Sequence, residues 1–337
     1  MNCSHRYIWC PALLSLLACV ALLSGCGRAE TEPGTETQTP AASPADTPRV
    51  VATVGMIADL AERIAGEHAT VDVLMQPGID PHLYQPTRDD LAALLNADLV
   101  LYNGLKLEGR MTDALKNARG AGRAVVPVAE SIPEDALLRL EEAELAVDGT
   151  EKLFDPHAWM DPSVWAQTVP VIRDALVEID PDNAGAYTAA AEELQNELLE
   201  LHAYAQRVLD TVPKSQRVLV TAHDAFGYFG RQYGFEVLGI QGISTQSEAG
   251  VRDIERLVAV LVERGVPAVF VESTVSERNV NALIAGAQAR DHAVSVGGEL
   301  FSDAMGPDGT PEGTYVGMLR HNVDTIAAAL GGTVDAR

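Results

Sequence analysis

Beyond Arg49, short apolar runs alternate with longer segments in which apolar residues recur every three or four positions. Such short runs are typical of buried strands, and the periodic segments are typical of amphipathic helices. The alternation predicts an α/β fold of mostly parallel sheets with covering helices. Strands are expected at residues 50–54, 71–75, 99–102, 124–128, 218–221, 236–240, 268–272 and 293–296. Helices are expected at residues 57–65, 87–96, 164–179, 254–264, 279–290 and 315–330.

One segment in the middle of the chain differs from this alternation. After Pro181, which suits a first helical turn, the sequence AYTAAAEELQNELLELHAYAQRVLD continues for about seven helical turns without Gly or Pro. We expect one long helix here, joining two lobes that each contain a mostly parallel sheet. Because ligands of open α/β sheets bind at the carboxyl ends of strands, two facing lobes would form a binding cleft.

The first residues are expected to direct export and not to fold. An apolar run over residues 8–23 ends in Leu-Ser-Gly-Cys, which resembles the lipobox of bacterial lipoproteins. Cleavage before Cys26 and lipidation of its thiol are therefore expected, with an uncleaved anchor as the alternative. Residues 27–48 are rich in Thr, Pro, Ala and Glu and have no apolar periodicity, which predicts a disordered tether.

The net charge of the chain limits the classes of partner that it can bind. There are 24 Lys and Arg against 48 Asp and Glu, which gives a formal net charge of −24. Such a surface repels phosphate backbones, so a nucleic-acid partner is excluded. Hydrophobic residues make up 47% of the sequence, which excludes global disorder. An acidic surface suits both cation binding and simple solubility, and net charge does not separate the two.

Four residues near expected strand ends form a candidate metal site. They are His82, His157, His223 and Asp303, and the tripeptide Asp-Pro-His occurs at two of them. Three imidazoles and one carboxylate suit a borderline divalent cation, for which zinc fits best and manganese is the alternative. A single loop histidine is more often structural, so from spacing alone the metal site and four separate structural roles stay open.

Carboxylates near these histidines are candidates for orienting an imidazole by accepting its second N–H. A helix cap or a turn is the alternative role for each. The candidates are Asp80, Asp155, Asp161 and Asp224. Among the other histidines, a surface turn is expected for His68, a solvated position on the long helix for His202, and structural roles for His292 and His321. The aromatic residues Trp159, Trp165, Phe226 and Tyr228 are expected in the core.

The motifs around these residues resemble a known family. The chain is similar over residues 50–330 to the metal-binding lipoproteins of bacterial ABC importers, the cluster A-I or TroA/ZnuA family, and most similar to its TroA branch. The motifs that carry the resemblance are NGLKLEGRM (103–111), LFDPHAWMD (153–161), VTAHDAFGYF (220–229), GISTQSEAG (242–250), GGELFSDAMG (297–306) and EGTYVGMLRHNVDTI (312–326).

The resemblance implies a metal bound between the lobes and shielded from water. His82 and His157 would come from the N-terminal lobe, and His223 and Asp303 from the C-terminal lobe. It also implies a rigid linking helix with modest closure. The monomeric, extracytoplasmic protein, anchored through lipid on Cys26, would deliver its metal to an ABC permease driven by an ATP-binding subunit. The expected division is a signal peptide at 1–25, a tether at 26–48, an N-terminal lobe at 49–180, a linking helix at 181–211 and a C-terminal lobe at 212–337.

Two sequence features bear on the metal. Zinc-specialised members often carry a His-rich acidic loop, whereas residues 130–155 are acidic without histidine. Manganese-leaning relatives often have Glu at the third ligand position, whereas this chain has His223, which favours zinc. We expect a zinc receptor, with a manganese-dedicated receptor as the alternative.

Two other classes of function compete with this interpretation. A zinc hydrolase requires an open metal position and a base, for which Glu272 or Glu299 are candidates. For both residues we expect instead a position at the edge of the core or a role in supporting a metal ligand. Four protein ligands would close such a site, and the chain has no His-Glu-x-x-His, Gly-x-Ser-x-Gly or P-loop motif. We therefore expect no enzyme. A surface adhesin is the other alternative, because a lipid anchor would display the acidic protein on the outside of the cell, where an adhesin acts.

Overall fold

The computed structural model describes residues 47–140 and 153–334, all within one compact unit, Ser43–Arg337. The expected signal peptide, the lipidation site Cys26 and most of the tether lie outside the described residues. In the part of the chain that is described, no helix combines the length and the apolar character needed to cross a bilayer. The mixed α/β class and the two lobes joined by a long helix are as predicted.

The N-terminal lobe contains a four-stranded parallel sheet in the order β2-β1-β3-β4. Its strands are β1 (Arg49–Ala52), β2 (Thr70–Val73), β3 (Leu99–Tyr102) and β4 (Ala124–Pro127). Its helices are α1 (Gly55–Ala65), α2 (Arg88–Asn96), α3 (Thr112–Gly120), α4 (Pro162–Trp165) and α5 (Val169–Ile179). Thr87 begins α2 as expected, because its hydroxyl and the Asp90 carboxylate form a reciprocal capping box.

The C-terminal lobe contains two parallel strand pairs, β5-β6 and β7-β8, with β5 beside β7. The strands are β5 (Val218–His223), β6 (Glu236–Gln241), β7 (Ala268–Glu272) and β8 (Ser295–Leu300). The helices are α7 (Gly227–Tyr233), α8 (Val251–Arg264), α9 (Arg278–Gln288) and α10 (Tyr315–Ala329). The last strand, predicted at residues 293–296, lies later and continues through Gly297 to Leu300. A Cβ on Gly297 would lie 2.7 Å from the Phe270 ring, so the glycine allows β8 to pack closely against β7.

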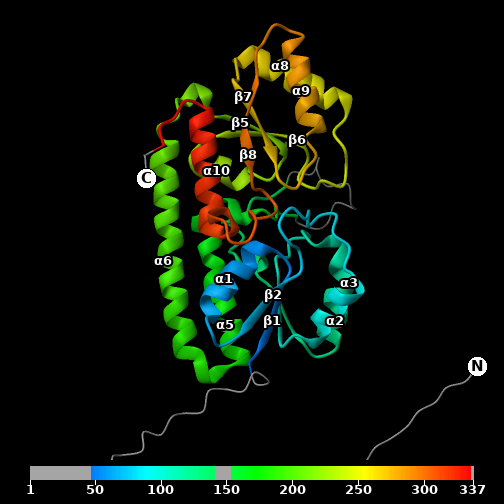
Figure 1. Cartoon of the computed structure of the whole chain (residues 1–337), viewed down its shortest axis with the longest axis vertical. Helices are drawn as coiled ribbons and strands as arrows, with labels where there is room; N and C mark the ends of the chain where they lie inside the picture. The colour runs from blue at the N-terminus through cyan, green and yellow to red at the C-terminus, as the bar shows by residue number, and fades with distance from the viewer. Residues whose placement is uncertain (1–46, 141–152, 335–337) are drawn as a thin grey trace, which may run out of the picture. The chain divides into compact units, whose positions relative to one another are not determined.

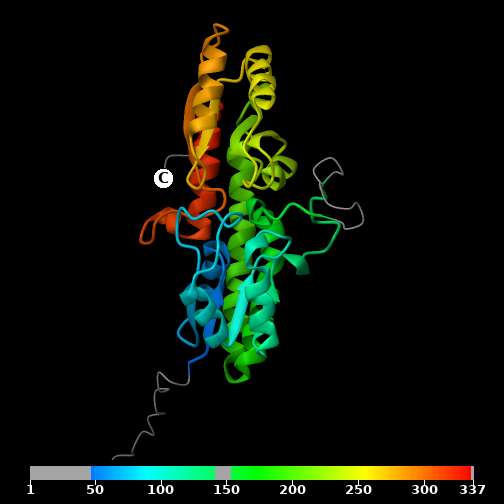
Figure 2. The same cartoon turned by 90° about the vertical axis from the view of Figure 1, so that its right-hand side faces the viewer.

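The linking helix α6 (Ala184–Leu209) runs beside both lobes in two perpendicular views (Figure 1 and Figure 2). It packs against α1 and α5 of the N-terminal lobe and against α10 of the C-terminal lobe. The side chains at its expected apolar spacing are buried: Leu194, Leu198, Leu201, Ala205 and Leu209. The long helix predicted from the sequence is confirmed, although a 3-10 turn, Pro181–Asn183, precedes it.

The single helix predicted at residues 164–179 is wrong, since it is divided into α4 and α5 by a 3-10 turn, Ala166–Thr168. Pro170 has no N–H to donate to the carbonyl of Ala166. The side-chain amide of Gln195, on α6, donates to that carbonyl instead, at 3.2 Å. The break in the helix is thus compensated by a contact with the linking helix.

One buried apolar cluster extends from the N-terminal sheet across α6 to the C-terminal lobe, where it includes Phe226 and Phe301. A second cluster lies under α8 and α9. The expected core aromatics Trp159, Trp165, Phe226 and Tyr228 are fully buried. Because the two lobes and the linking helix share the first cluster, relative movement of the lobes is resisted by apolar contacts.

Candidate metal centre

The four sequence-predicted residues meet between the two lobes. His82, His157, His223 and Asp303 each offer a ligand atom, and these atoms lie within 4.8 Å of one another. The two Nε2 atoms of His82 and His157 are 3.2 Å apart. The Asp303 carboxylate lies 3.3 Å from the Nε2 atoms of both His157 and His223 and 3.5 Å from that of His82. All four side chains are buried.

Each side chain reaches the centre from a different segment. His223 is the last residue of β5, and Asp303 follows the end of β8. His82 lies in the turn after β2, and His157 precedes a 3-10 turn, Ala158–Met160. The C-terminal lobe thus supplies its two groups at the carboxyl ends of strands, whereas the N-terminal lobe supplies two imidazoles from loops.

Several polar atoms at the centre lack hydrogen-bond partners among the described residues. Among the described residues, Nε2 of His223 and both carboxylate oxygens of Asp303 are buried without a hydrogen-bond partner. Buried polar atoms of this kind are rare, because each costs free energy unless a partner is supplied. A cation among three imidazole nitrogens and a carboxylate would satisfy all of them at once. The donor set therefore fits a divalent metal ion.

The electrostatics of the cluster agree with this. Burial lowers the pKa of His82 to about 4. Burial acts in the same direction on His157, but the carboxylates of Asp155 and Asp303 raise its pKa to about 9. Burial also opposes the net pKa shifts of His223 and Asp303. Glu272 and Asp303 raise the pKa of His223, whereas His223 and His157 hold the pKa of Asp303 well below its usual range.

Two carboxylates orient the imidazoles. Asp155 Oδ1 accepts from both the backbone N–H of His157, at 2.9 Å, and its Nδ1, at 2.7 Å. Glu272 holds His223 in the same way, with Oε1 2.9 Å from the backbone nitrogen and Oε2 2.5 Å from Nδ1. Because each Nδ1 is bound, each Nε2 is directed at the centre.

The sequence-based candidates for this role had different outcomes. Asp155 lies where an orienting carboxylate was expected. Asp161 accepts from the backbone N–H and hydroxyl of Ser163 and begins α4, which is the alternative role of a helix cap. The backbone N–H of Asp224 donates to Gly242, at 3.4 Å. Glu272, for which a position at the edge of the core or a supporting role was expected over that of a hydrolase base, ends β7 as His223 ends the neighbouring β5.

The remaining candidate, Asp80, contacts two different segments. Its Oδ1 accepts from the backbone N–H of His82 at 2.8 Å, as in the other Asp-Pro-His turn. Its Oδ2 accepts from the hydroxyl of Thr245, in the C-terminal lobe, at 2.5 Å. Burial raises the pKa of Asp80, while the bond from Thr245 acts to lower it.

Contacts behind the centre hold the Asp303 loop against the His157 loop. The indole N–H of Trp159 donates to the carbonyl of Ser302 at 2.8 Å, and the Tyr315 hydroxyl donates to the carbonyl of Trp159 at 2.7 Å. The Trp159 ring packs edge-on against the His157 imidazole. These bonds join the lobes next to the ligands, so the two halves of the centre are held in register.

The other histidines lie outside the cluster. Nε2 of His292 lies 2.9 Å from the carbonyl of Val266, and Nε2 of His321 lies 2.9 Å from that of Glu299, which fits their expected structural roles. The solvated position expected for His202 is wrong, because its ring is partly buried with Nδ1 3.3 Å from the Tyr233 hydroxyl. His68 is on a turn as expected, with its ring edge-on to that of Tyr187.

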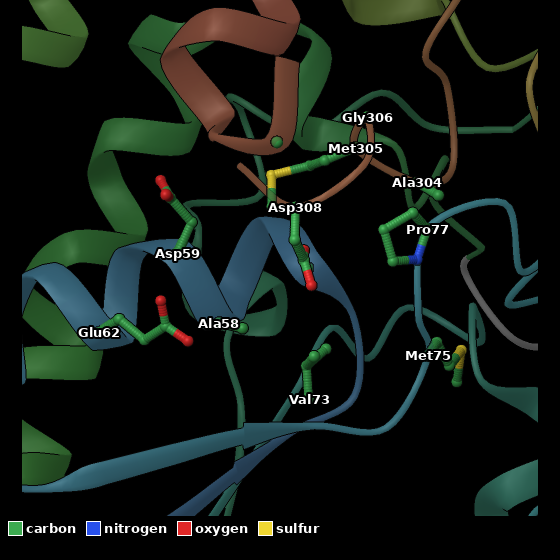
Figure 3. A pocket seen from close by; sticks show the side chains of 12 residues that line it. Ala58, Asp59, Glu62, Val73, Met75, Pro77, Ala304, Met305, Gly306 and Asp308 are labelled. Atoms are coloured by element: carbon green, nitrogen blue, oxygen red, sulfur yellow. The ribbon is translucent and has the colours of Figure 1, made fainter. Parts of the chain in front are cut away.

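A small cavity beside α1 differs from the metal centre (Figure 3). It has a volume of about 80 Å³, and its lining includes Asp59, Glu62 and Asp308 but no histidine. Burial raises the pKa of Asp59, which accepts from the backbone N–H of Tyr315. Met305, two residues after Asp303, packs close to Gly55 at the start of α1. We interpret the cavity as a packing gap beneath the Asp303 loop.

Comparisons with known proteins agree with the geometry. A family model described as zinc-uptake complex component A, periplasmic, matches residues 50–329. The zinc-binding protein TroA of Treponema pallidum (strain Nichols) is 50% identical over 283 residues, which cover 84% of this chain and 89% of TroA. The manganese-binding lipoprotein MntA of Bacillus subtilis (strain 168) is 46% identical over 282 residues, with 84% of this chain and 89% of MntA covered.

A solved structure extends the match to three dimensions. The periplasmic zinc-binding protein TroA from Treponema pallidum matches with a TM-score of 0.80 at 49% identity, covering 84% of this chain and 99% of that chain. The family predicted from the motifs is therefore confirmed. The chain belongs to the ZnuA family, the periplasmic component A of zinc-uptake complexes.

Proposed function

We propose that this protein captures a zinc ion with His82, His157, His223 and Asp303 and delivers it to an ABC permease for import. The observation that carries the proposal is the convergence of four buried side chains between the two lobes. Three of their polar atoms, Nε2 of His223 and both carboxylate oxygens of Asp303, have no hydrogen-bond partner among the described residues. Zinc is bound by imidazole and carboxylate ligands in this ratio, and the orienting carboxylates Asp155 and Glu272 raise the basicity of two imidazoles.

The same geometry favours capture over catalysis. A catalytic zinc keeps one coordination position open for water or substrate, whereas four protein ligands close a tetrahedral site. His157 and His223 are fully buried, so a substrate larger than the ion has no direct approach to them. We therefore propose a binding protein without hydrolytic activity, in agreement with its family.

Manganese is the second candidate, and one observation favours it. Oδ1 of Asp303 lies 3.3 Å from the nitrogen of His157, and Oδ2 lies 3.3 Å from that of His223. Both oxygens thus face the centre, and a bidentate carboxylate would give five donors in place of four. A higher coordination number suits manganese better than structural zinc. The relatives named above, one zinc-binding and one manganese-binding, have similar identities to this chain.

We also propose that the protein is a monomer outside the cytoplasm, anchored by lipid on Cys26 and partnered by a permease with its ATP-binding subunit. The names of relatives such as the MntA lipoprotein support the anchor. The boundaries 49–180, 181–211 and 212–337 remain our proposed division of the folded part. Mass spectrometry of a membrane fraction tests the anchor, since Cys26→Ala should release the protein from it.

The test of the metal function is a competition titration. Metal-stripped protein, residues 27–337, is mixed with zinc and manganese together, and the bound metal is measured after separation. One equivalent of zinc held against excess manganese supports a zinc receptor. Comparable binding of both ions supports a receptor whose cargo is set by metal availability. Binding of neither ion contradicts the four-ligand site and the proposed function with it.

A further inference from the structure

One loop of the C-terminal lobe reaches across to the N-terminal half of the metal centre. The segment 242–250, GISTQSEAG, connects β6 to α8 and contains none of the four ligand residues. Two of its side chains bond to the turn that carries His82. The Thr245 hydroxyl donates to Asp80 Oδ2 at 2.5 Å, and the Gln246 amide donates to the carbonyl of His82 at 3.3 Å.

The same loop forms a wall of a cavity that reaches the centre. This cavity has a volume of about 380 Å³, and its lining includes His82, Phe154, Pro156, Gly242, Ile243 and Ser244. His82 is 3% exposed, whereas His157 and His223 are 0% exposed. The His82 side of the cluster is therefore the side from which solvent comes nearest to the ligand atoms.

The bonds within the loop are weaker than those that hold the other ligands. The Gln241 amide donates to the carbonyl of Ser247 at 3.2 Å, and the backbone N–H of Gln246 donates to the Ser244 hydroxyl at 3.4 Å. Gln246, Ser247 and Glu248 are exposed. A surface loop with few bonds opens at a lower free-energy cost than a buried strand. The bond from Thr245 to a carboxylate is the strongest contact of this loop with the opposite lobe, because it is short and its acceptor is an ionisable, partly buried group.

We propose that the metal enters and leaves past His82 through this cavity, and that the Thr245–Asp80 hydrogen bond is the latch that breaks during each passage. This inference rests on the proposed function. Asp80 Oδ1 accepts from the backbone N–H of His82, so release of Thr245 also frees the turn that presents this imidazole. Neither Thr245 nor Asp80 is one of the four ligand residues, so loss of their bond leaves all four donors in place and alters the rates of entry and exit more than the equilibrium between them.

Stopped-flow measurement of zinc binding and of zinc release to excess chelator tests the latch. We expect Thr245→Val, which keeps the side-chain shape but removes the donor, to speed zinc release about tenfold, the scale of one hydrogen bond to a charged group. Zinc entry should accelerate similarly, so that the Kd changes by less than about threefold. Thr245→Ser keeps the hydroxyl and should restore the wild-type rates. Glu248→Gln is the matched control, because Glu248 lies in the same loop but outside the cavity lining and accepts from Asn279 of its own lobe.

Asp80→Ala provides a second background. If Thr245 acts through Asp80, Thr245→Val should add little to the release rate of Asp80→Ala, whereas additive effects would contradict the inference. An unchanged release rate in Thr245→Val would also overturn it, as would faster release with unchanged entry. Stoichiometric zinc binding by the wild-type protein separates these results from a failure of the proposed function, which would abolish binding in every variant.

Discussion

The tripeptide Asp-Pro-His occurs twice in this protein, and the two copies perform different tasks at the same centre. In both, the aspartate accepts from the backbone N–H of the histidine two residues later, at 2.8 Å for His82 and 2.9 Å for His157. Asp155 also binds the ring nitrogen of His157, whereas Asp80 binds Thr245 of the opposite lobe. The local sequence thus determines the turn, and the surrounding fold determines what the second contact of the carboxylate does.

The difference arises from the neighbours of each turn. The carbonyl of Asp155 accepts from the Tyr228 hydroxyl, and its Oδ2 lies 2.8 Å from the position that a Cβ on Gly227 would occupy. Gly227 begins α7, so the lack of a side chain there lets the turn approach the helix closely. The His82 turn meets the loop 242–250 instead, through Thr245 and Gln246. One turn thus packs against a helix, whereas the other bonds to a surface loop, whose release is the step proposed above.

The largest effects are expected from removing the imidazoles themselves. His157→Ala and His82→Ala should each weaken zinc binding by more than about 100-fold, because loss of a ligand exceeds the cost of losing its supporting carboxylate. Competition titration against a chelator of known affinity measures this. His68→Ala, a histidine outside the cluster, is the control and should bind zinc as the wild type does. Equal affinities for the control and both ligand variants would remove His82 and His157 from the site.

Removal of the orienting carboxylate comes next. Asp155→Asn keeps the size of the side chain but weakens the hold on the His157 ring, and we expect zinc affinity to fall about 10- to 100-fold. Glu272→Gln should have a comparable effect through His223, since the two carboxylates contact their histidines in the same way. An affinity within about twofold of wild type for both variants would show that the rings are held by packing alone.

Metal-dependent stability gives a separate measurement of the same difference. Zinc at 100 times the wild-type Kd should stabilise the wild-type fold by about 2.7 kcal/mol, and excess chelator should remove this gain. For a variant that binds 100-fold more weakly, the same zinc concentration contributes only about 0.4 kcal/mol. Thermal unfolding with and without chelator should therefore show a clear shift for the wild type and for Asp80→Asn, and a reduced shift for Asp155→Asn. Identical shifts in all three proteins would contradict a special role of Asp155.

The sequence predicts the four residues that cluster at this centre better than the groups that support them. His82, His157, His223 and Asp303 stand in distinctive motifs, and most strands and helices follow from apolar periodicity. A supporting role was expected for Glu272, but its partner was not, because Glu272 is 49 residues from His223 and reaches it only through the neighbouring strands β5 and β7. Local spacing favoured Asp224 instead, because it directly follows His223 in the sequence. Asp224 lies after the end of β5 and not on β7, the strand that brings Glu272 to His223.

The two unpredicted helices have a related explanation. Neither α3 nor α7 appears among the expected helices, because α3 is largely polar and α7 contains two glycines in seven residues. Both are stabilised by tertiary contacts: α7 buries Tyr228, Phe229 and Tyr233, and Gly234 ends it in the left-handed conformation. Local propensity is a weak guide where burial of aromatic side chains supplies the stability.

The smallest effect on affinity is expected from the aspartate of the other turn. Asp80→Asn keeps an oxygen that accepts from the backbone N–H of His82, and no orienting bond to the imidazole is lost with the charge. Zinc affinity should therefore stay within about threefold of the wild type, well below the loss expected for Asp155→Asn. The two variants remove the same charge from the same tripeptide, so a chelator titration of both in one buffer isolates the contact with the ring. If Asp80→Asn weakened zinc binding as much as Asp155→Asn, the two turns would support their histidines equally, and the contrast drawn from their carboxylate contacts would be wrong.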